Sequence, residues 1–409
     1  MRWKPNPEPD PDPLSPDPNP LPPPKPLIPN PPPYPNPPVR PPIPQLTCPQ
    51  DSTNCIAALR MEYVKTGTLE SLFKASPFNF LGIVRHDRSS GVPSALAVCP
   101  VVCLDLPQFT SAPPLAEVWT SRLPVTYHQA EDIHCAMTDE VLFGSLQLEE
   151  RPGMRLDILT YRAYRRLLLE IRALGYPHLL RVWNYFPHIN REANGLERYR
   201  HFCVGRHQAL AEDCLDFPRT VPAGTAIGTM SGPLSIHFLT ARQPGMHVEN
   251  PRQVSAYKYP QVYGPRSPSF ARATLRPSTS GSQLFIAATG SVVGHVSAHI
   301  GKPLTQTLEI LLNLNALITH TEQIYGIGRG EWGGVAVFKV YVRQPEHFER
   351  VRDILKERLP SHVQILYLQG EMCRRELLVE IEGILGLEMT HVASQTESPA
   401  HERILQRSC

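Results

Sequence analysis

The chain has 409 residues, with 40 Lys and Arg against 38 Asp and Glu, so its net charge is only +2 at pH 7. This length allows two or three domains with a sizeable core, and the near balance of charge excludes a global attraction to nucleic acid or to a membrane surface. No run of about eighteen apolar residues occurs, and the N-terminus lacks the apolar stretch of a signal peptide, so we expect no membrane span and no secretion signal.

The nine cysteines are scattered and form neither a CxxC pair nor a zinc-finger spacing. Isolated cysteines in odd number are typical of free thiols in a reducing cytoplasm, where we expect the protein to work. His201 and His207 stand six residues apart with no acidic cluster beside them, so we expect no metal site. The sequence has no glycine-rich phosphate loop and no dinucleotide fingerprint, and we expect no cofactor.

Residues 1–46 contain about half of the chain's 46 prolines. Proline at this density removes amide donors and fixes extended backbone, which predicts a disordered tail with polyproline II character. PxxP matches such as residues 38–41 suit an aromatic groove, but they arise by chance in such a tract, which favours a linker or solubility tail. The polar residues 391–409 are expected to form a second tail.

Between the tails, hydrophobic periodicity predicts two series of elements. The first has strands at 80–84 and 95–104 with a turn at 91–93 between them, a strand at 141–148, a helix at 157–174, a strand at 179–186, a loop at 188–195, a helix from Leu196 and a strand at 232–241. The second has a strand at 283–290, a helix at 304–318, a strand at 335–342, a helix at 345–359 and strands at 363–368 and 378–382. The apolar stripe of the helix at 304–318 is expected at Leu308, Leu311, Leu312 and Asn315.

The repeated order of strand, helix, strand, helix and strand predicts an α+β fold of related modules, each a mixed sheet with helices on one face. We expect an N-terminal domain at 47–245, in which residues 47–132 form a degenerate further module. A C-terminal domain is expected at 246–390.

The last predicted strand alternates apolar and acidic residues, which places Glu380 and Glu382 on one face. If that face is buried, each carboxyl needs a partner or a raised pKa. The alternative is a half-exposed edge strand with both acids solvated, because charged residues are seldom buried unpaired.

Five motifs occur in order: Arg181–Tyr185, Glu197–His207, Glu249–Tyr257, Tyr263–Arg272 and Cys373–Glu382. Over residues 75–385 they resemble the chorismatase family, which removes pyruvate from chorismate. The C-terminal part also resembles the Rid/YjgF (reactive-intermediate deaminase) fold, through Tyr263–Ser267, Leu284–Gly290, Gln306–Leu308 with Asn313–Leu314, Val337–Val342 and Val379–Gly383. The resemblance implies Rid/YjgF-like (chorismate mutase-like) modules in a pseudo-trimeric arrangement within one chain, in agreement with the repeat.

The resemblance implies that Glu380 is the general acid that protonates the enolpyruvyl methylene group. A carboxyl group in an apolar strand site favours its neutral form, as this role requires. Glu382 is expected either to support the surrounding network or to face solvent.

Chorismate carries two carboxylates, and such groups suit forked cationic anchors, which favours Arg over Lys. The candidates are Arg198, Arg206, Arg266 and Arg272. We expect about half of them to contact substrate and the others to pair with acids. Tyr199 and Tyr263 either orient the substrate through their hydroxyls or pack in the core.

Two fates of the protonated enol ether stay open. Attack by water gives a dihydroxycyclohexadiene carboxylate, whereas displacement by the neighbouring ring hydroxyl followed by aromatisation gives 3-hydroxybenzoate. At Gly290 and Cys373 this chain resembles the aromatising subtype of the family. The hydrolytic subtype has alanine at the first of these positions and a small apolar residue at the second. Cys373 is expected to assist proton transfer or to be an inert buried thiol. A mixture with 4-hydroxybenzoate also stays open.

Two further hypotheses are a non-catalytic Rid-like ligand-binding protein and an imine deaminase. Motifs rich in arginine and tyrosine argue against the first. The second calls for a carboxylate-binding arginine before the final strand, and residues 363–368 contain none. We therefore expect a chorismatase that acts on a small-molecule substrate, as a monomer or small homo-oligomer.

Overall fold

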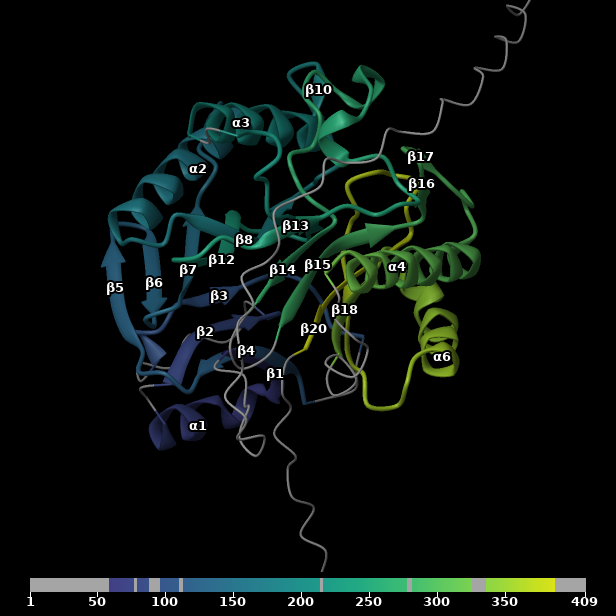
Figure 1. The fold of residues 1–409 in the computed structure, drawn as a ribbon. Coiled ribbons are helices and arrows are strands. Elements are labelled where there is room, and N and C mark those ends of the chain that lie inside the picture. Colours follow the sequence, from purple (N-terminus) through teal and green to yellow (C-terminus); the bar gives the residue numbers. More distant parts are fainter. Residues whose placement is uncertain are drawn as a thin grey trace, which may run out of the picture. The chain divides into compact units, whose positions relative to one another are not determined.

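The structure is a computed structural model, and it describes residues 59–76, 79–87, 96–109, 113–213, 216–277, 282–325 and 336–386. The two predicted tails and the predicted turn at 91–93 lie outside the described residues. Three mixed sheets and their helices account for most of the described chain (Figure 1). The predicted α+β class is therefore confirmed.

The middle sheet has the strand order β11-β8-β12-β7-β6-β5. Its elements follow the chain as β5 (Thr126–Ala130), β6 (Ile133–Met137), β7 (Val141–Leu148), α2 (Leu156–Ala173), β8 (His178–Pro187), α3 (Arg198–Asp213), β11 (Ala223–Thr229) and β12 (Leu234–Ala241). Strands β8 and β11 run parallel, and β12 runs antiparallel between β8 and β7.

The C-terminal sheet has the order β13-β14-β15-β20-β18-β19. Its elements are β13 (Met246–Val248), β14 (Ala273–Arg276), β15 (Gln283–Gly290), α4 (Pro303–Tyr325), β18 (Ala336–Val342), α6 (Phe348–Arg358), β19 (Gln364–Gln369) and β20 (Val379–Leu385). Two small hairpins stand apart from the large sheets: β9 (Glu192–Ala193) with β10 (Leu196–Glu197), and β16 (Val292–Val293) with β17 (Val296–Ser297).

The first sheet, ordered β1-β4-β2-β3, repeats the same strand order without the leading hairpin. It consists of β1 (Leu59–Lys65), α1 (Leu69–Ala75), β2 (Phe80–Arg85), β3 (Val101–Cys103) and β4 (Leu115–Ser121). In all three sheets, the last strand in sequence returns antiparallel between the strand before the first helix and the strand after it. The repeat predicted from the order of elements is therefore present at the level of strand pairing.

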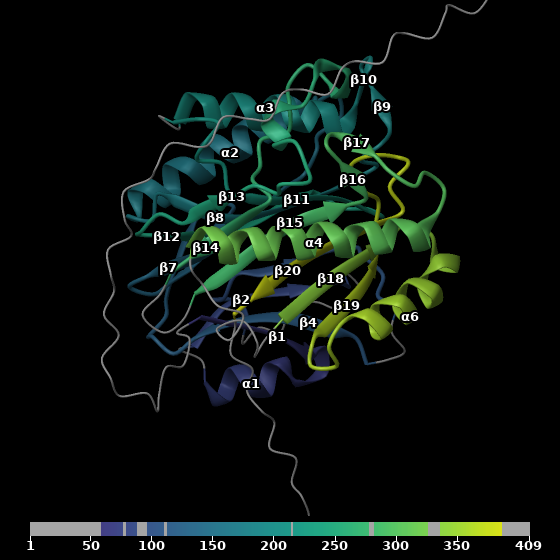
Figure 2. The same cartoon turned by 45° about the vertical axis from the view of Figure 1, so that its right-hand side comes forward.

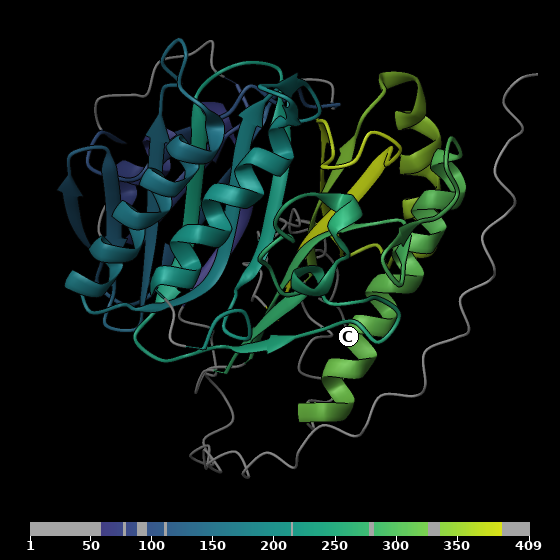
Figure 3. The ribbon, with the colours of Figure 1, turned by 90° about the horizontal axis from the view of Figure 1, so that it is seen from above.

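Helices α2, α3, α4 and α6 lie on the outer faces of their sheets, so the inner faces are turned toward one another (Figures 2 and 3). A shared apolar core fills the space between the inner faces, to which the first, middle and C-terminal sheets contribute Trp119, Trp183 and Tyr341. The centroids of the Trp119 and Trp183 rings are 5.7 Å apart. The middle and C-terminal sheets each have a further apolar core beneath their own helices. The central core is therefore the region in which the modules contact one another.

The predicted strands at 141–148 and 283–290 are confirmed with the same bounds. The predicted strand at 95–104 is wrong in length, because only Val101–Cys103 is a strand, and the predicted loop at 188–195 contains β9. The edge-strand alternative for residues 378–382 is also wrong, since β20 lies between β15 and β18.

The predicted apolar stripe of α4 is wrong. Leu308 and Leu312 are 37% and 55% exposed, whereas Ile310, Leu314 and Leu317 are buried. Apolar residues occur on several sides of this helix, so spacing alone did not identify the face that packs on the sheet. Among the described helices, none combines the length and apolarity that a membrane crossing requires.

Candidate active site

A cavity of about 790 Å³ opens between the middle and C-terminal modules. One wall comes from the β9–β10 hairpin and the start of α3, and the other from β15, β20 and the segment Cys373–Leu377. The cavity is of a size that holds a small organic ligand. Acidic, basic and aromatic side chains all line it, so it is built for a polar ligand rather than an apolar one.

Glu380 lies in the wall of this cavity and is only 4% exposed. Burial raises the pKa of Glu380 to about 7, although the nearby Arg343 lowers it. Because this pKa is close to neutral, the carboxyl group can donate a proton at neutral pH.

The thiol of Cys373 lies beside this carboxyl group and donates to Glu380 Oε1 across 3.8 Å. Burial raises the pKa of Cys373 well above its usual value, so the group is a neutral thiol. A smaller cavity, called the inner cavity below, shares Cys373 and Glu380 with the first and is lined also by Tyr199, Cys203 and Arg206.

Gly290 lies directly opposite Glu380 in the neighbouring strand β15. A methyl group on Gly290 would lie 3.0 Å from Leu377 Cδ1 and 3.4 Å from Glu380 Oε1. The absence of a side chain at this position leaves the space beside the carboxyl group open.

Arg206 is 3% exposed and lines the inner cavity close to Glu380. Its Nε and Nη2 atoms find no hydrogen-bond partner among the described residues. A buried guanidinium with free donors is costly unless an anion pairs with it. Arg206 is thus a candidate anchor for a carboxylate.

Arg272 lines the main cavity. Its Nη2 atom donates to Val254 O at 3.0 Å and to Tyr259 Oη at 2.7 Å. Tyr199 and Tyr263 also line the cavity, and Tyr263 Oη donates to the His295 carbonyl at 2.6 Å.

The other two predicted arginines lie outside both cavity linings. Arg198 donates to both oxygens of Glu150, at 2.8 and 2.7 Å, and Arg266 is exposed. The structure therefore brings together Arg206 and Arg272 of the four candidates, together with Tyr199, Tyr263, Gly290, Cys373 and Glu380.

Sequence reasoning missed Arg374, which lines the cavity next to Cys373. Its guanidinium stacks 4.2 Å from the ring centroid of Tyr263 and 5.2 Å from that of Tyr259. It also donates to His295 O and Ser297 Oγ, at 3.0 and 2.9 Å. Its place in the Cys373–Glu382 motif was an available signal.

The backbone around the segment Cys373–Leu377 is held by hydrogen bonds from two side chains. Arg343 donates to the carbonyls of Met372, Arg374 and Leu377 at 3.0–3.1 Å. Gln306 of α4 donates to Glu376 O at 2.9 Å and accepts from Leu378 N at 2.8 Å. These hydrogen bonds thus fix the backbone segment that precedes Glu380.

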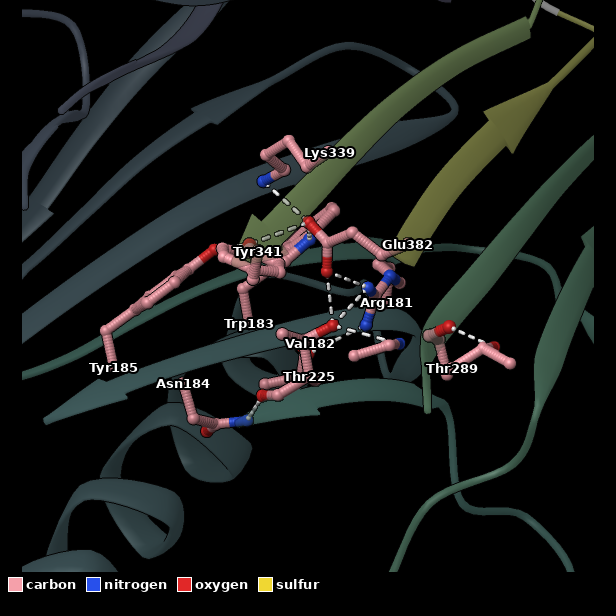
Figure 4. Close-up of polar contacts among 12 residues, drawn as sticks. Arg181, Val182, Trp183, Asn184, Tyr185, Thr225, Thr289, Lys339, Tyr341 and Glu382 are labelled. Carbon is pink, nitrogen blue, oxygen red and sulfur yellow. Dashed lines mark hydrogen bonds and ion pairs between the residues drawn. The ribbon is translucent and has the colours of Figure 1, made fainter. Parts of the chain in front are cut away.

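Glu382, two residues beyond Glu380, belongs to a buried network and not to the cavity lining (Figure 4). Its carboxylate is 2% exposed and pairs with Lys339 and Arg181, each at 2.7 Å. Trp183 Nε1 and Tyr341 Oη donate to Glu382 Oε1, at 3.0 and 3.2 Å.

The same network reaches the first sheet, because Lys339 also pairs with Glu117 at 2.9 Å. Burial alone would lower the pKa of Lys339, but Glu117 and Glu382 raise it well above its usual value. Burial alone would raise the pKa of Glu382, but Lys339 and Arg181 hold it below its usual value. The two acids of β20 therefore differ: Glu382 is an ionised structural partner, and Glu380 is the titrating group.

Within the described residues, no three His, Cys, Asp or Glu side chains gather as a group that could hold a metal ion. Fold and cavity together define an α+β protein with a buried, titrating carboxylic acid among arginines. Such a site suits acid chemistry on a small anionic ligand.

Comparisons of the sequence and of the structure with known proteins point to the same family. Residues 117–240 match the family model described as chorismatase FkbO/Hyg5-like, N-terminal. A 3-hydroxybenzoate synthase of Streptomyces hygroscopicus is 37% identical over 316 residues, which cover 75% of this chain and 92% of that protein. A chorismatase of the same organism is 41% identical over 275 residues, which cover 66% of this chain and 79% of that protein.

A crystal structure of a chorismatase matches with a TM-score of 0.73 at 36% identity, covering 81% of this chain and 99% of the other. This chain therefore belongs to the chorismatase family.

Proposed function

We propose that this protein converts chorismate to 3-hydroxybenzoate and pyruvate. The observation that carries the proposal is Glu380, whose buried carboxyl group has a pKa of about 7 and lies in the cavity wall opposite Gly290. The relative named 3-hydroxybenzoate synthase, 37% identical, supports the same product.

In the proposed reaction, Glu380 gives its proton to the terminal methylene of the enolpyruvyl group, and the ether becomes an oxocarbenium ion. The neighbouring ring hydroxyl attacks the ring carbon that bears the enolpyruvyl oxygen, and the bond between that carbon and the enolpyruvyl oxygen breaks, so that pyruvate leaves with this oxygen as its carbonyl. The hydroxyl oxygen then bridges two ring carbons, and its bond to its original carbon breaks. The carbon that now bears the hydroxyl loses its hydrogen as a proton when the ring becomes aromatic, and the Glu380 carboxylate takes up a proton in return. The two products together contain all the atoms of chorismate, so no water is consumed.

The cationic side chains of the cavity have distinct places in this scheme. Arg206 faces the inner end with free donors, and Arg374 and Arg272 lie in the main cavity. A substrate with two carboxylates can then be held at both ends, which orients the enol ether toward Glu380. Cys373 supports the acid as a neutral hydrogen-bond donor.

We also propose that the sheets are Rid/YjgF-like modules in a pseudo-trimeric arrangement, with domain boundaries at 47–245 and 246–390. The repeated strand pairing supports this. Glu117, His237 and Glu382 come from the return strands β4, β12 and β20 and lie around the same buried cluster, where His237 stacks on Trp183 at 4.7 Å. The expected cytoplasmic location and the expected state as a monomer or small homo-oligomer stay predictions.

The test is incubation of the purified protein with chorismate, with pyruvate measured by a coupled assay and the ring product by chromatography. We expect both pyruvate and 3-hydroxybenzoate, and Glu380→Gln should lower the rate about 100-fold or more, since it cannot donate the proton. Exposed Glu357→Gln on α6 is the matched control and should keep full activity. Absence of pyruvate above background would refute the function, and a diene acid or 4-hydroxybenzoate as main product would refute the proposed outcome of the cation.

A further inference from the structure

Strand β15 carries a β-bulge next to Glu380. At one end of its ladder with β20, Ile286 lies opposite Gly383, and at the other end Gly290 lies opposite Glu380. Two residues of β15, Ala287 and Ala288, therefore stand against the single residue Glu382. Two residues opposed to one constitute a bulge, and bulges next to active sites serve to re-aim a side chain.

The bulge determines which residue faces the acid. If the regular ladder continued from the pair of Ile286 and Gly383, Thr289 would lie opposite Glu380. Directly opposite residues project on the same face of a sheet, so the Thr289 side chain would occupy the space beside the carboxyl group. The extra residue places Gly290 there instead and leaves that space open to the cavity.

The bulge is held from outside its own sheet. The Ala288 amide donates to Oγ1 of Thr225, at 3.3 Å, and Thr225 belongs to β11 of the middle sheet. The same hydroxyl accepts from Arg181 Nη2 at 2.5 Å and donates to Glu382 (Figure 4). A hydroxyl has one donor and two acceptor sites, so all three sites of Thr225 are in use.

The partners of Thr225 are themselves fixed. Glu382 is held by Lys339, Arg181, Trp183 and Tyr341. The backbone carbonyl of Thr225 accepts from Asn184 at 2.7 Å. The residue that the bulge spans, Glu382, is thus also the residue that anchors the hydroxyl holding the bulge.

We propose that Thr225 is a positioning residue for product choice: its hydroxyl, fixed by Glu382 and Arg181, holds the bulge that places Gly290 beside Glu380. The inference rests on the proposed function, because the ring product is its main readout. Without the hydroxyl, the Ala288 amide and a Glu382 oxygen each lose a buried partner, and such losses favour relaxation of the bulge. The space beside the acid then closes, and the ring is held differently.

The test compares Thr225→Val, which removes the hydroxyl at nearly constant shape, with Thr225→Ser, which retains it. For Thr225→Val we expect kcat to fall about tenfold or more, KM to change less than about threefold, and the diene acid to rise at the expense of 3-hydroxybenzoate. Thr225→Ser should restore the wild-type product ratio and a kcat within about twofold of wild type.

Thr240→Val is the matched control for loss of a buried hydroxyl. Thr240 lies in β12, away from the cavity lining, and its hydroxyl has the carbonyls of Tyr176 and His178 within hydrogen-bond distance as acceptors for its one proton. We expect it to lower thermal stability without altering the product ratio. If Thr225→Val does not fold, Thr225→Ala takes its place, with the same criteria.

An unchanged product ratio and kcat in Thr225→Val, or a Thr225→Ser variant that behaves like Thr225→Val, would overturn the proposal. A crystal structure of the valine variant tests the bulge apart from the reaction: a retained bulge with Gly290 opposite Glu380 overturns the inference even if the wild type makes no pyruvate. Loss of activity in the wild type itself refutes the proposed function instead.

Discussion

Glu380 and Gly290 face each other across two neighbouring strands, and a methyl group on the glycine would lie 3.4 Å from the carboxyl oxygen Oε1. In the proposed reaction, the pair defines the part of the cavity in which the enol ether and the acid meet. Small changes on either side of this pair are therefore expected to alter the chemistry more than the fold.

Gly290→Ala is expected to change the product ratio. The added methyl group would lie 3.0 Å from Leu377 Cδ1, so Leu377 must shift by a few tenths of an ångström. We expect the substrate ring to be displaced from Glu380 for the same reason. We expect a larger share of diene acid and a kcat lowered about tenfold, with thermal stability changed little. Chromatography of the products checks this, and an unchanged ratio would show that position 290 does not set ring placement.

The rate should depend on pH through Glu380. In the proposed reaction Glu380 acts only when protonated, and burial raises its pKa to about 7. The value of kcat/KM should therefore be level below pH 7 and fall about tenfold per pH unit above it. A bound dianion disfavours the carboxylate further, so the corresponding fall in kcat should begin at higher pH.

Cys373→Ala supplies the internal check on this profile. The thiol donates to Glu380 and thereby lowers the pKa of that carboxyl group. Its removal should move the falling limb of kcat/KM to higher pH. A limb that stays in place would mean that another group controls the profile.

The same acid should make the protein less stable at high pH. Its pKa rises from 4.5 in the unfolded chain to about 7 in the folded protein, so the folded state binds the extra proton between these values, and stability falls as pH rises from about 4.5 through 7. The full difference corresponds to about 3 kcal/mol. Glu380→Gln lacks this loss, so its stability relative to wild type should be greater at pH 8 than at pH 5.

Urea denaturation at the two pH values measures this difference, with Glu357→Gln as the control. An equal effect of Glu380→Gln at both pH values would contradict a raised pKa. A gain in stability together with a loss of activity is the usual signature of a strained functional group.

Local patterns predicted those parts of the fold that depend on local sequence. The strands at 141–148 and 283–290 are long apolar runs, and both bounds agreed with the structure. Strand β11, Ala223–Thr229, was missed because it contains two glycines and little apolar volume. Its position comes from pairing with β8, which no local pattern reveals.

In the candidate site, too, local sequence predicted some features, whereas others depend on the fold. Alternation on β20 placed Glu380 and Glu382 on one face, but only the fold shows that Glu382 is paired with Lys339 and Arg181, far away in sequence, and that Glu380 lies in the cavity wall. Charge type alone could not separate Arg206 from Arg198, because the difference lies in Glu150, which neutralises Arg198. The pairing of charges across modules is a property of the fold and not of any one motif.

Arg206 is expected to bind a substrate carboxylate, and its removal should affect binding without loss of stability. The guanidinium is buried with two nitrogens that lack partners among the described residues, so Arg206→Leu relieves an unpaired charge in the ligand-free protein. In the complex the substrate anion would lose its partner, at a cost of about 2–5 kcal/mol, which corresponds to a KM raised about 30-fold or more.

Exposed Arg266→Leu is the matched control, since Arg266 belongs to another motif of the same family pattern, Tyr263–Arg272, but lies outside the cavity lining. We expect its KM to stay within about twofold of wild type. Arg206→Lys keeps the charge but loses the fork, so its KM should lie between those of wild type and Arg206→Leu. Steady-state kinetics and thermal unfolding check all three variants. An Arg206→Leu variant that is clearly less stable, with an unchanged KM, would make Arg206 a structural residue and leave Arg374 and Arg272 as the anchors.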